Sequence, residues 1–245
     1  MAAEDNSSPA SRYSALGIDP TLYPDLVEAG GLAPAMRHLA AEHGIELGEI
    51  SAPAWASTSI TEATIEMAGG SIYVVIRRDF RSFSLNLSRT GRVQADGVSG
   101  DLLCVVKAAD AWREGASLAR IAELFPFVSY DGLAAAFEKG APAPFQWDRL
   151  LGDAELYEIR PLLMAARDHE SLGQMFATVT HYVSLFLQMD PVDQSRGGIW
   201  IRMKDDGYTI EPAWSHEVTR VHTIVDALAA AEQALRAPGP PLPLE

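Results

Sequence analysis

Five of the sixteen arginines lie in one short stretch, "RRDFRSFSLNLSRTGR", which runs from residue 77 to residue 92. Guanidinium groups bind carboxylates and phosphates through paired hydrogen bonds. Gathered at the ends of neighbouring strands, they would seat an acidic peptide or a phosphorylated small molecule, and an exposed strand nearby would pair with an extended peptide backbone. The alternative is that they pair with the chain's own 33 carboxylates. The predicted ligand-binding residues are Arg77, Arg78, Arg81, Arg89 and Arg92.

Histidines next to carboxylates form the second group with a chemical meaning. His169 stands between Asp168 and Glu170 at the expected end of a helix, and His181 opens the strand expected after it. A neighbouring carboxylate orients a histidine for acid–base catalysis, so Asp168, His169, Glu170 and His181 are the candidate catalytic residues. The alternative is that the helix dipole favours a histidine at that end.

Sequence signatures of metal and cofactor sites do not occur. There is no HxxxH, HExxH or CxxC spacing, and no GxGxxG, GxxxxGK[ST] or GxSxG motif. We therefore predict neither a metal nor a cofactor. The single cysteine, Cys104, excludes an internal disulfide, and its apolar surroundings favour a small buried thiol over a nucleophile.

Composition excludes further classes of protein. The formal net charge of −14 argues against nucleic-acid binding, which usually needs a basic surface. No apolar run approaches the ~18 residues of a membrane span, and no secretory signal opens the sequence. With one cysteine, these features predict a cytoplasmic protein without a membrane partner.

The elements that must position the arginines follow the order helix, antiparallel strands, helix. Helical periodicity covers residues 31–44 and 100–115, and strands are expected near 64–67, 71–78 and 82–89. In the last strand Phe83, Leu85 and Leu87 alternate with polar residues, as in a sheet with one buried face.

The same order recurs in the second half of the chain. A helix is expected within 159–176, a strand over 180–189 and a hairpin over 197–212 that turns at Asp205, Asp206 and Gly207. Ser215 is expected to cap a last helix. Its predicted buried stripe comprises Val218, Val221, Ile224, Val225 and Leu228.

We therefore predict an α+β fold built from two pseudo-repeated units, with helices packed on antiparallel sheets. Ser117 and Asp131 are expected to begin two short connecting helices, and "APAPFQW" at 141–147 to form a stiff linker. The predicted divisions are a disordered arm (1–20), a first unit with its helical connector (21–144), a second unit (145–236) and a flexible proline-rich tail (237–245).

The connecting segment "ADAWREGASLARIAELFPFV", followed by "LAAAFEKG", resembles an actinobacterial family of uncharacterised proteins. "LYPDLVEAGGLAPAMRHLAAEHGIELG" and "PLLMAARDHESLGQMF" are similar to it as well, so the resemblance covers most of residues 20–236. Members are typically encoded beside natural-product genes, including those for modified peptides, which implies a pathway and no particular reaction. The matching positions in the connector are Ala111, Trp112, Gly115, Ala116, Ser117, Leu118, Pro126, Phe127, Val128, Glu138 and Gly140.

Three functions follow as hypotheses. The first is a non-catalytic accessory binding protein of a natural-product pathway, which holds a peptide precursor or a pathway enzyme. The second is a cofactor-free enzyme, of cyclase or isomerase type, that uses His169 or His181 with a carboxylate. The third is a carrier or immunity protein that sequesters the pathway product.

Overall fold

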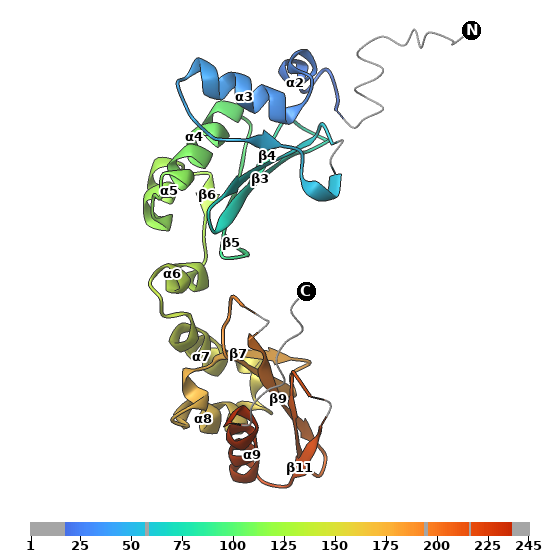
Figure 1. Ribbon diagram of the computed structural model, residues 1–245, viewed down its shortest axis with the longest axis vertical. Helices are drawn as coiled ribbons and strands as arrows, with labels where there is room; N and C mark the ends of the chain where they lie inside the picture. The colour runs from blue at the N-terminus through green and yellow to red at the C-terminus, as the bar shows by residue number, and fades with distance from the viewer. Residues whose placement is uncertain (1–17, 57–58, 194–195, 216, 237–245) are drawn as a thin grey trace, which may run out of the picture. The chain divides into compact units, whose positions relative to one another are not determined.

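The computed structural model describes residues 18–236 apart from 57–58, 194–195 and 216. The chain forms two compact units, Met1–Ala135 and Ala136–Glu245, each with helices and one antiparallel sheet (Figure 1). The predicted α+β class is confirmed. Most of the predicted arm and the whole predicted tail lie outside the described residues, but Ile18, which the prediction placed in the arm, is fully buried in the first core.

The first unit contains a six-stranded antiparallel sheet, with strands in the order β1-β2-β3-β4-β5-β6. Its elements are α2 (Pro24–Ala29), α3 (Leu32–Glu42), β1 (Ile50–Ser51), η1 (Ala54–Ala56), β2 (Glu62–Met67), β3 (Gly70–Ile76), β4 (Phe83–Arg89), β5 (Arg92–Ser99), α4 (Leu102–Arg113), α5 (Leu118–Leu124), β6 (Val128–Ser129) and α6 (Gly132–Glu138), which runs across the division between the units.

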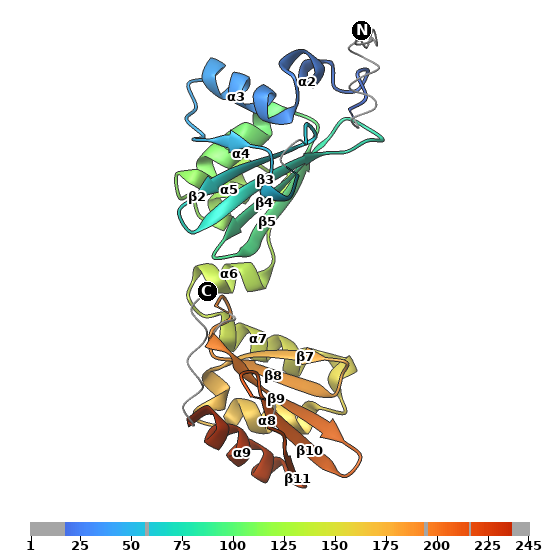
Figure 2. The ribbon, with the colours of Figure 1, turned by 45° about the vertical axis from the view of Figure 1, so that its right-hand side comes forward.

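Buried apolar residues alternate with more exposed polar residues along the strands, so one face of this sheet is buried in the core. Phe83, Leu85 and Leu87 of β4 are fully buried, whereas the serines and the asparagine between them are partly exposed, as predicted. The helices α3 and α4 contribute their apolar sides to the same core. The short turn η1 lies on the other side of the sheet from α4 and α5 (Figures 1 and 2).

Capping residues fix where the helices of the first unit begin. The Asp101 carboxylate accepts a hydrogen bond of 2.8 Å from the amide of Leu103 at the start of α4. Ser117 caps α5 through the amide of Arg120, as predicted. The Asp131 carboxylate accepts from the amide of Ala134 and so begins α6.

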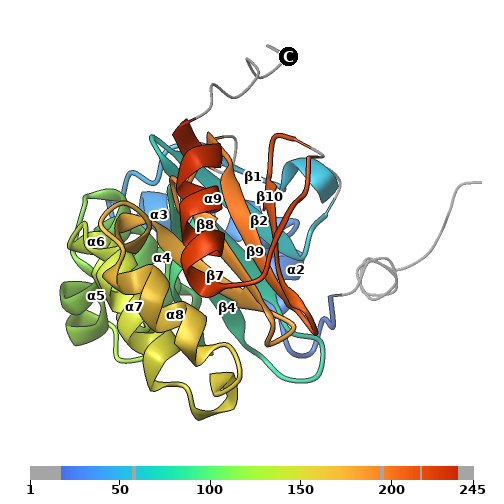
Figure 3. The ribbon, with the colours of Figure 1, turned by 90° about the horizontal axis from the view of Figure 1, so that it is seen from below.

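The second unit contains a five-stranded antiparallel sheet, with strands in the order β11-β10-β9-β8-β7. Its elements are α7 (Pro142–Gly152), η2 (Ala154–Leu156), α8 (Arg160–Asp168), η3 (Leu172–Gln174), β7 (Phe176–Thr180), β8 (Ser184–Gln188), β9 (Gly198–Lys204), β10 (Gly207–Pro212), β11 (Thr219–Val221) and α9 (Ile224–Arg236). The helix α9 packs across β9 and β10 (Figure 3), and the hairpin between them turns at Asp205 and Asp206 as predicted.

One prediction about the second unit is wrong. The segment 141–147 is not a linker but the first half of α7, because Pro142 fits the first helical turn and Trp147 anchors the helix by donating its indole N–H to the carbonyl of Met175 at 3.1 Å. This helix belongs to the second unit, so the contacts divide the chain between residues 135 and 136 rather than at 144/145.

The last helix begins later than predicted. Residues 219–221 form β11, and the hydroxyl of Thr223, not Ser215, caps α9 by accepting from the amide of Asp226 at 3.1 Å. Of the predicted stripe, Leu228 is buried but Val225 is 76% exposed. The predicted stripe included Val221, which belongs to the strand β11, as well as residues of α9, so a single helical periodicity could not describe it.

Both units place helices before and after an antiparallel meander. Whether this common order reflects an internal repeat stays a prediction.

Candidate functional site

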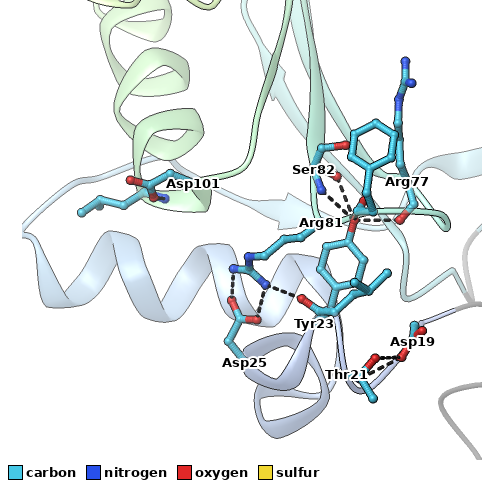
Figure 4. A network of polar contacts seen from close by, with 11 residues as sticks. Asp19, Thr21, Tyr23, Asp25, Arg77, Arg81, Ser82 and Asp101 are labelled. Atoms are coloured by element: carbon cyan, nitrogen blue, oxygen red, sulfur yellow. Dashed lines mark hydrogen bonds and ion pairs between the residues drawn. The ribbon is translucent and has the colours of Figure 1, made fainter.

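The loop between β3 and β4, residues 77–82, carries three of the predicted arginines and is built around a buried tyrosine. Tyr23 is fully buried, and its hydroxyl lies 2.7 Å from the carbonyl oxygen of Arg77 and 3.0 Å from that of Ser82. The hydroxyl also accepts a hydrogen bond of 2.9 Å from the amide of Ser82, and Arg77 N donates to Ser82 O at 3.1 Å. Figure 4 shows these contacts, which hold the two ends of the loop together.

Arg81 is held inside this arrangement. Its guanidinium donates two hydrogen bonds, of 2.7 and 2.8 Å, to the carboxylate of Asp25 on α2, and a third to the carbonyl of Leu22 (Figure 4). It also lies over the rings of Tyr23 and Phe83. The hydrogen bonds from Arg81 lower the pKa of the Asp25 carboxyl below its usual value. Arg81 therefore joins α2 to the loop.

Arg77 and Arg78 are different, because both side chains are exposed. The guanidinium of Arg77 lies 5.6 Å from the ring centre of the exposed Phe80 and points away from the Tyr23 network (Figure 4). Within the described residues neither arginine forms an ion pair. The loop thus presents two guanidinium groups and an aromatic ring to solvent on a fixed backbone.

The other two arginines lie at the opposite end of β4. Arg89 is paired in register with Arg92 across the turn to β5. The Arg89 guanidinium lies 3.8 Å above the ring of Trp112 and donates to its carbonyl at 3.1 Å, near the end of α4. Seven residues of strand separate the two groups by about 20 Å. The structure therefore does not bring the five arginines together into one rim.

The histidine candidates lie in the second unit and are separated too. His169 follows α8, with its Nδ1 atom 3.3 Å from the hydroxyl of Ser171. That hydroxyl donates to the carboxylate of Glu232 at 3.1 Å. Because a hydroxyl has one hydrogen, Ser171 can donate to Glu232 or to His169 but not to both at once. Asp168 and Glu170, on either side of His169, are exposed.

His181 lies in the turn between β7 and β8 and does not open a strand. Its φ is 52°, and that of Tyr182 is 60°, so the predicted strand over 180–189 is in fact the end of β7, this turn, and β8. Nothing in the turn sequence signals this, since positive φ is usually supplied by Gly, Asn or Asp. The five residues of β7, about 13 Å long, lie between His181 and the segment that contains His169.

Cys104 is half-buried on α4, and its thiol donates to the carboxylate of Asp101 at 3.3 Å. This hydrogen bond to an anion raises the pKa of the thiol above its ordinary value, which disfavours the thiolate that a nucleophile requires. In the described part of the chain, no three His, Cys, Asp or Glu side chains converge as metal ligands would.

Sequence reasoning missed Tyr23 and Asp25, whose side chains bind the loop between β3 and β4, called the arginine loop below. Their partners lie more than fifty residues further along the chain. The only local signal is the position of Tyr23 directly before the proline that begins α2.

Comparison of the chain with models of known families, with curated proteins and with solved structures finds no match. Over the described residues, no helix combines the length and apolar character that crossing a bilayer requires.

Proposed function

We propose that this chain is a non-catalytic accessory protein that binds an acidic peptide, or an acidic segment of a partner enzyme, through the loop between β3 and β4. The observation that carries the proposal is the exposure of Arg77 and Arg78 on a loop whose backbone is tied to the buried hydroxyl of Tyr23. Arg81, held by Asp25, belongs to the framework of the loop.

Preorganisation is the physical reason why this loop suits recognition. A loop already fixed in one conformation loses little entropy when a ligand binds, so more of the interaction free energy appears as affinity. Guanidinium groups pair with carboxylates in a defined geometry, and Phe80 supplies apolar contact beside them.

Charge supports selectivity for one orientation of the partner. The chain as a whole carries a formal net charge of −14, which opposes the approach of acidic partners. The exposed pair Arg77 and Arg78 would then be the place where an acidic partner binds, and this binding should weaken as salt screens the charges.

The enzyme hypothesis receives less support from the geometry. Its two candidate histidines lie toward opposite ends of β7, and the hydroxyl of Ser171 stands between the ring of His169 and the carboxylate of Glu232. The natural-product context rests on the family resemblance of the sequence alone.

The test is selection from a random peptide library displayed on phage, with sequencing of the retained clones. The wild-type protein should enrich Asp- and Glu-rich peptides at low salt, and the variant Arg77→Ala/Arg78→Ala should lose this enrichment. The matched control is Arg120→Ala/Arg236→Ala, which removes two exposed arginines elsewhere and changes the net charge equally.

A third variant works in the opposite direction. Asp79 is the one carboxylate in the sequence of the loop, and Asp79→Asn should strengthen the selection of acidic peptides. The proposal fails if the control and the loop variant lose enrichment equally, or if the wild-type protein selects no acidic peptides.

A further inference from the structure

The face of the first sheet that does not meet α3 and α4 carries an exposed aromatic pair. Trp55 of η1 is 74% exposed, and its ring lies 5.6 Å from that of Tyr73 on β3, at an interplanar angle of 52°. Tyr73 points to this face because its neighbours Ile72 and Val74 are buried in the core. The two rings are therefore inclined to each other on the outer face of the sheet.

Carboxylates accompany these rings. Glu62, Thr64 and Glu66 of β2 alternate with the core residues Ala63 and Ile65, so all three belong to the outer face. Thr64 is directly opposite Tyr73 in the register of the two strands. Burial, together with the neighbouring Glu62 carboxylate, raises the pKa of Tyr73.

Two oxygen atoms at this place lack hydrogen-bond partners. Among the described residues, Oε2 of Glu62 and Oγ1 of Thr64 are buried without a partner, and Thr64 as a whole is only 5% exposed. A buried carboxylate oxygen without a donor is costly, and native proteins rarely leave one so. Both atoms can accept a hydrogen bond, and a bound group that donates would satisfy them.

The charge of this face restricts what that group is. By the strand register, the outer positions of β2, β3 and β4 are Glu62, Thr64, Glu66, Ser71, Tyr73, Val75, Ser84, Asn86 and Ser88. These positions include two carboxylates and no lysine or arginine. A cation is attracted both to the carboxylates and to the faces of tryptophan and tyrosine rings.

We propose that Trp55, Tyr73, Glu62 and Thr64 form a binding site for a primary alkylammonium group. The ammonium would donate to Glu62 and Thr64, and its alkyl chain would lie against the ring of Trp55. A primary ammonium fits better than a quaternary one because the unpartnered oxygens need N–H donors, of which a primary ammonium has three. The site is independent of the arginine loop, which prefers ligands of the opposite charge.

The experiment follows the indole N–H cross-peak of Trp55 in ¹H–¹⁵N spectra, assigned with Trp55→Phe, while n-pentylammonium is added. The peak should shift saturably with n-pentylammonium and not with n-pentanol, the neutral analogue of equal chain length. The indole peak of Trp147, which is buried in the second unit, should stay in place. A larger response to n-pentyltrimethylammonium than to n-pentylammonium would overturn the choice of a primary ammonium.

Matched variants test the role of the carboxylate. Glu62→Gln should weaken n-pentylammonium binding about tenfold, because a charged hydrogen bond becomes a neutral one. Glu66→Gln, on the same strand and face, should have a much smaller effect. Equal shifts with n-pentanol, equal losses in the two variants, or no shift of Trp55 with any amine would overturn the proposal.

Two sources of the ammonium can be separated with the same readout. Cadaverine represents a free diamine, and acetyl-Gly-Gly-Lys-Gly-Gly-amide represents a lysine side chain in a peptide. Saturable binding of either one supports the site, and the tighter of the two identifies its source.

Discussion

Removing one oxygen atom, by Tyr23→Phe, is expected to destabilise the first unit more than its small size suggests. The Tyr23 hydroxyl accepts from the amide of Ser82 and donates within the group of carbonyls at Arg77, Phe80 and Ser82. The ring itself is fully buried against Phe83, so phenylalanine keeps the packing and removes only the polar contacts.

The magnitude follows from which partners remain. The hydroxyl donates one hydrogen, so the substitution removes one donated and one accepted bond. Ser82 O keeps the amide of Arg77 as a donor, but the Ser82 amide loses its partner at a buried position. An ordinary hydrogen bond contributes about 1 kcal/mol, and an orphaned buried donor costs about 1–3 kcal/mol. The free energy of unfolding of the first unit should therefore fall by about 2–4 kcal/mol.

Hydrogen exchange of the Ser82 amide is the most direct assay, with urea denaturation as the global measure. In the variant, this amide should exchange at least tenfold faster, because its acceptor is absent. The control is Tyr157→Phe, which removes a hydroxyl on a residue that is 69% exposed and whose one hydrogen bond to a described residue is to Glu158. It should change stability by less than about 0.5 kcal/mol. If Tyr23→Phe costs no more than this control, the hydroxyl does not organise the loop.

Two further predictions concern pH and the last helix. Because the Arg81 hydrogen bonds lower the pKa of Asp25 in the folded state, the pair stabilises the protein above the unfolded pKa of about 3.9, and this stabilisation is lost as the pH falls through the lower folded value. The side chains of Arg81 and Asp25 are 35% and 44% exposed, so the pair should contribute less than about 1 kcal/mol to the free energy of unfolding. When stability is measured as the pH is lowered, Asp25→Asn should lose less stability than wild type. Identical pH profiles of the two proteins would contradict this role of the pair. In α9, Leu228→Ala should destabilise the second unit by about 2–3 kcal/mol and Val225→Ala by less than about 0.5 kcal/mol, as measured by urea denaturation. Comparable losses in the two variants would mean that Val225 is buried, as the sequence-based prediction had it, and would contradict the structure.

Local patterns were sufficient for most of the elements. The alternation in β4, the cap at Ser117 and the turn at Asp205–Asp206 are each visible within a few residues, and each prediction is confirmed. The strand β5 was missed because a register shift opposite Leu87 and Ser88 interrupts its alternation, so that the adjacent residues Gln94 and Ala95 are both buried.

The candidate site was less accessible to sequence reasoning, because its partners are distant along the chain. The arginine stretch was visible as a charge pattern, but its division between the two ends of β4 depends on the strand bounds. The contacts of Tyr23 and Asp25 with the loop arise only when α2 packs near the end of β3. The Trp55–Tyr73 pair likewise joins residues whose sequence spacing carries no periodic signal.

Arginines in one stretch thus have different roles, and the difference lies in the partners that folding brings to them. The guanidinium groups of Arg81 and Arg89 are bonded to Asp25 and to Trp112, which lie 56 and 23 residues away in sequence, whereas those of Arg77 and Arg78 meet solvent. A variant that replaces Arg81 together with the exposed pair would remove a bond to α2 as well as binding capacity, and a loss of binding would then have two causes. Replacing Arg77 and Arg78 alone separates them, because stability should stay near that of wild type while recognition of an acidic partner is lost.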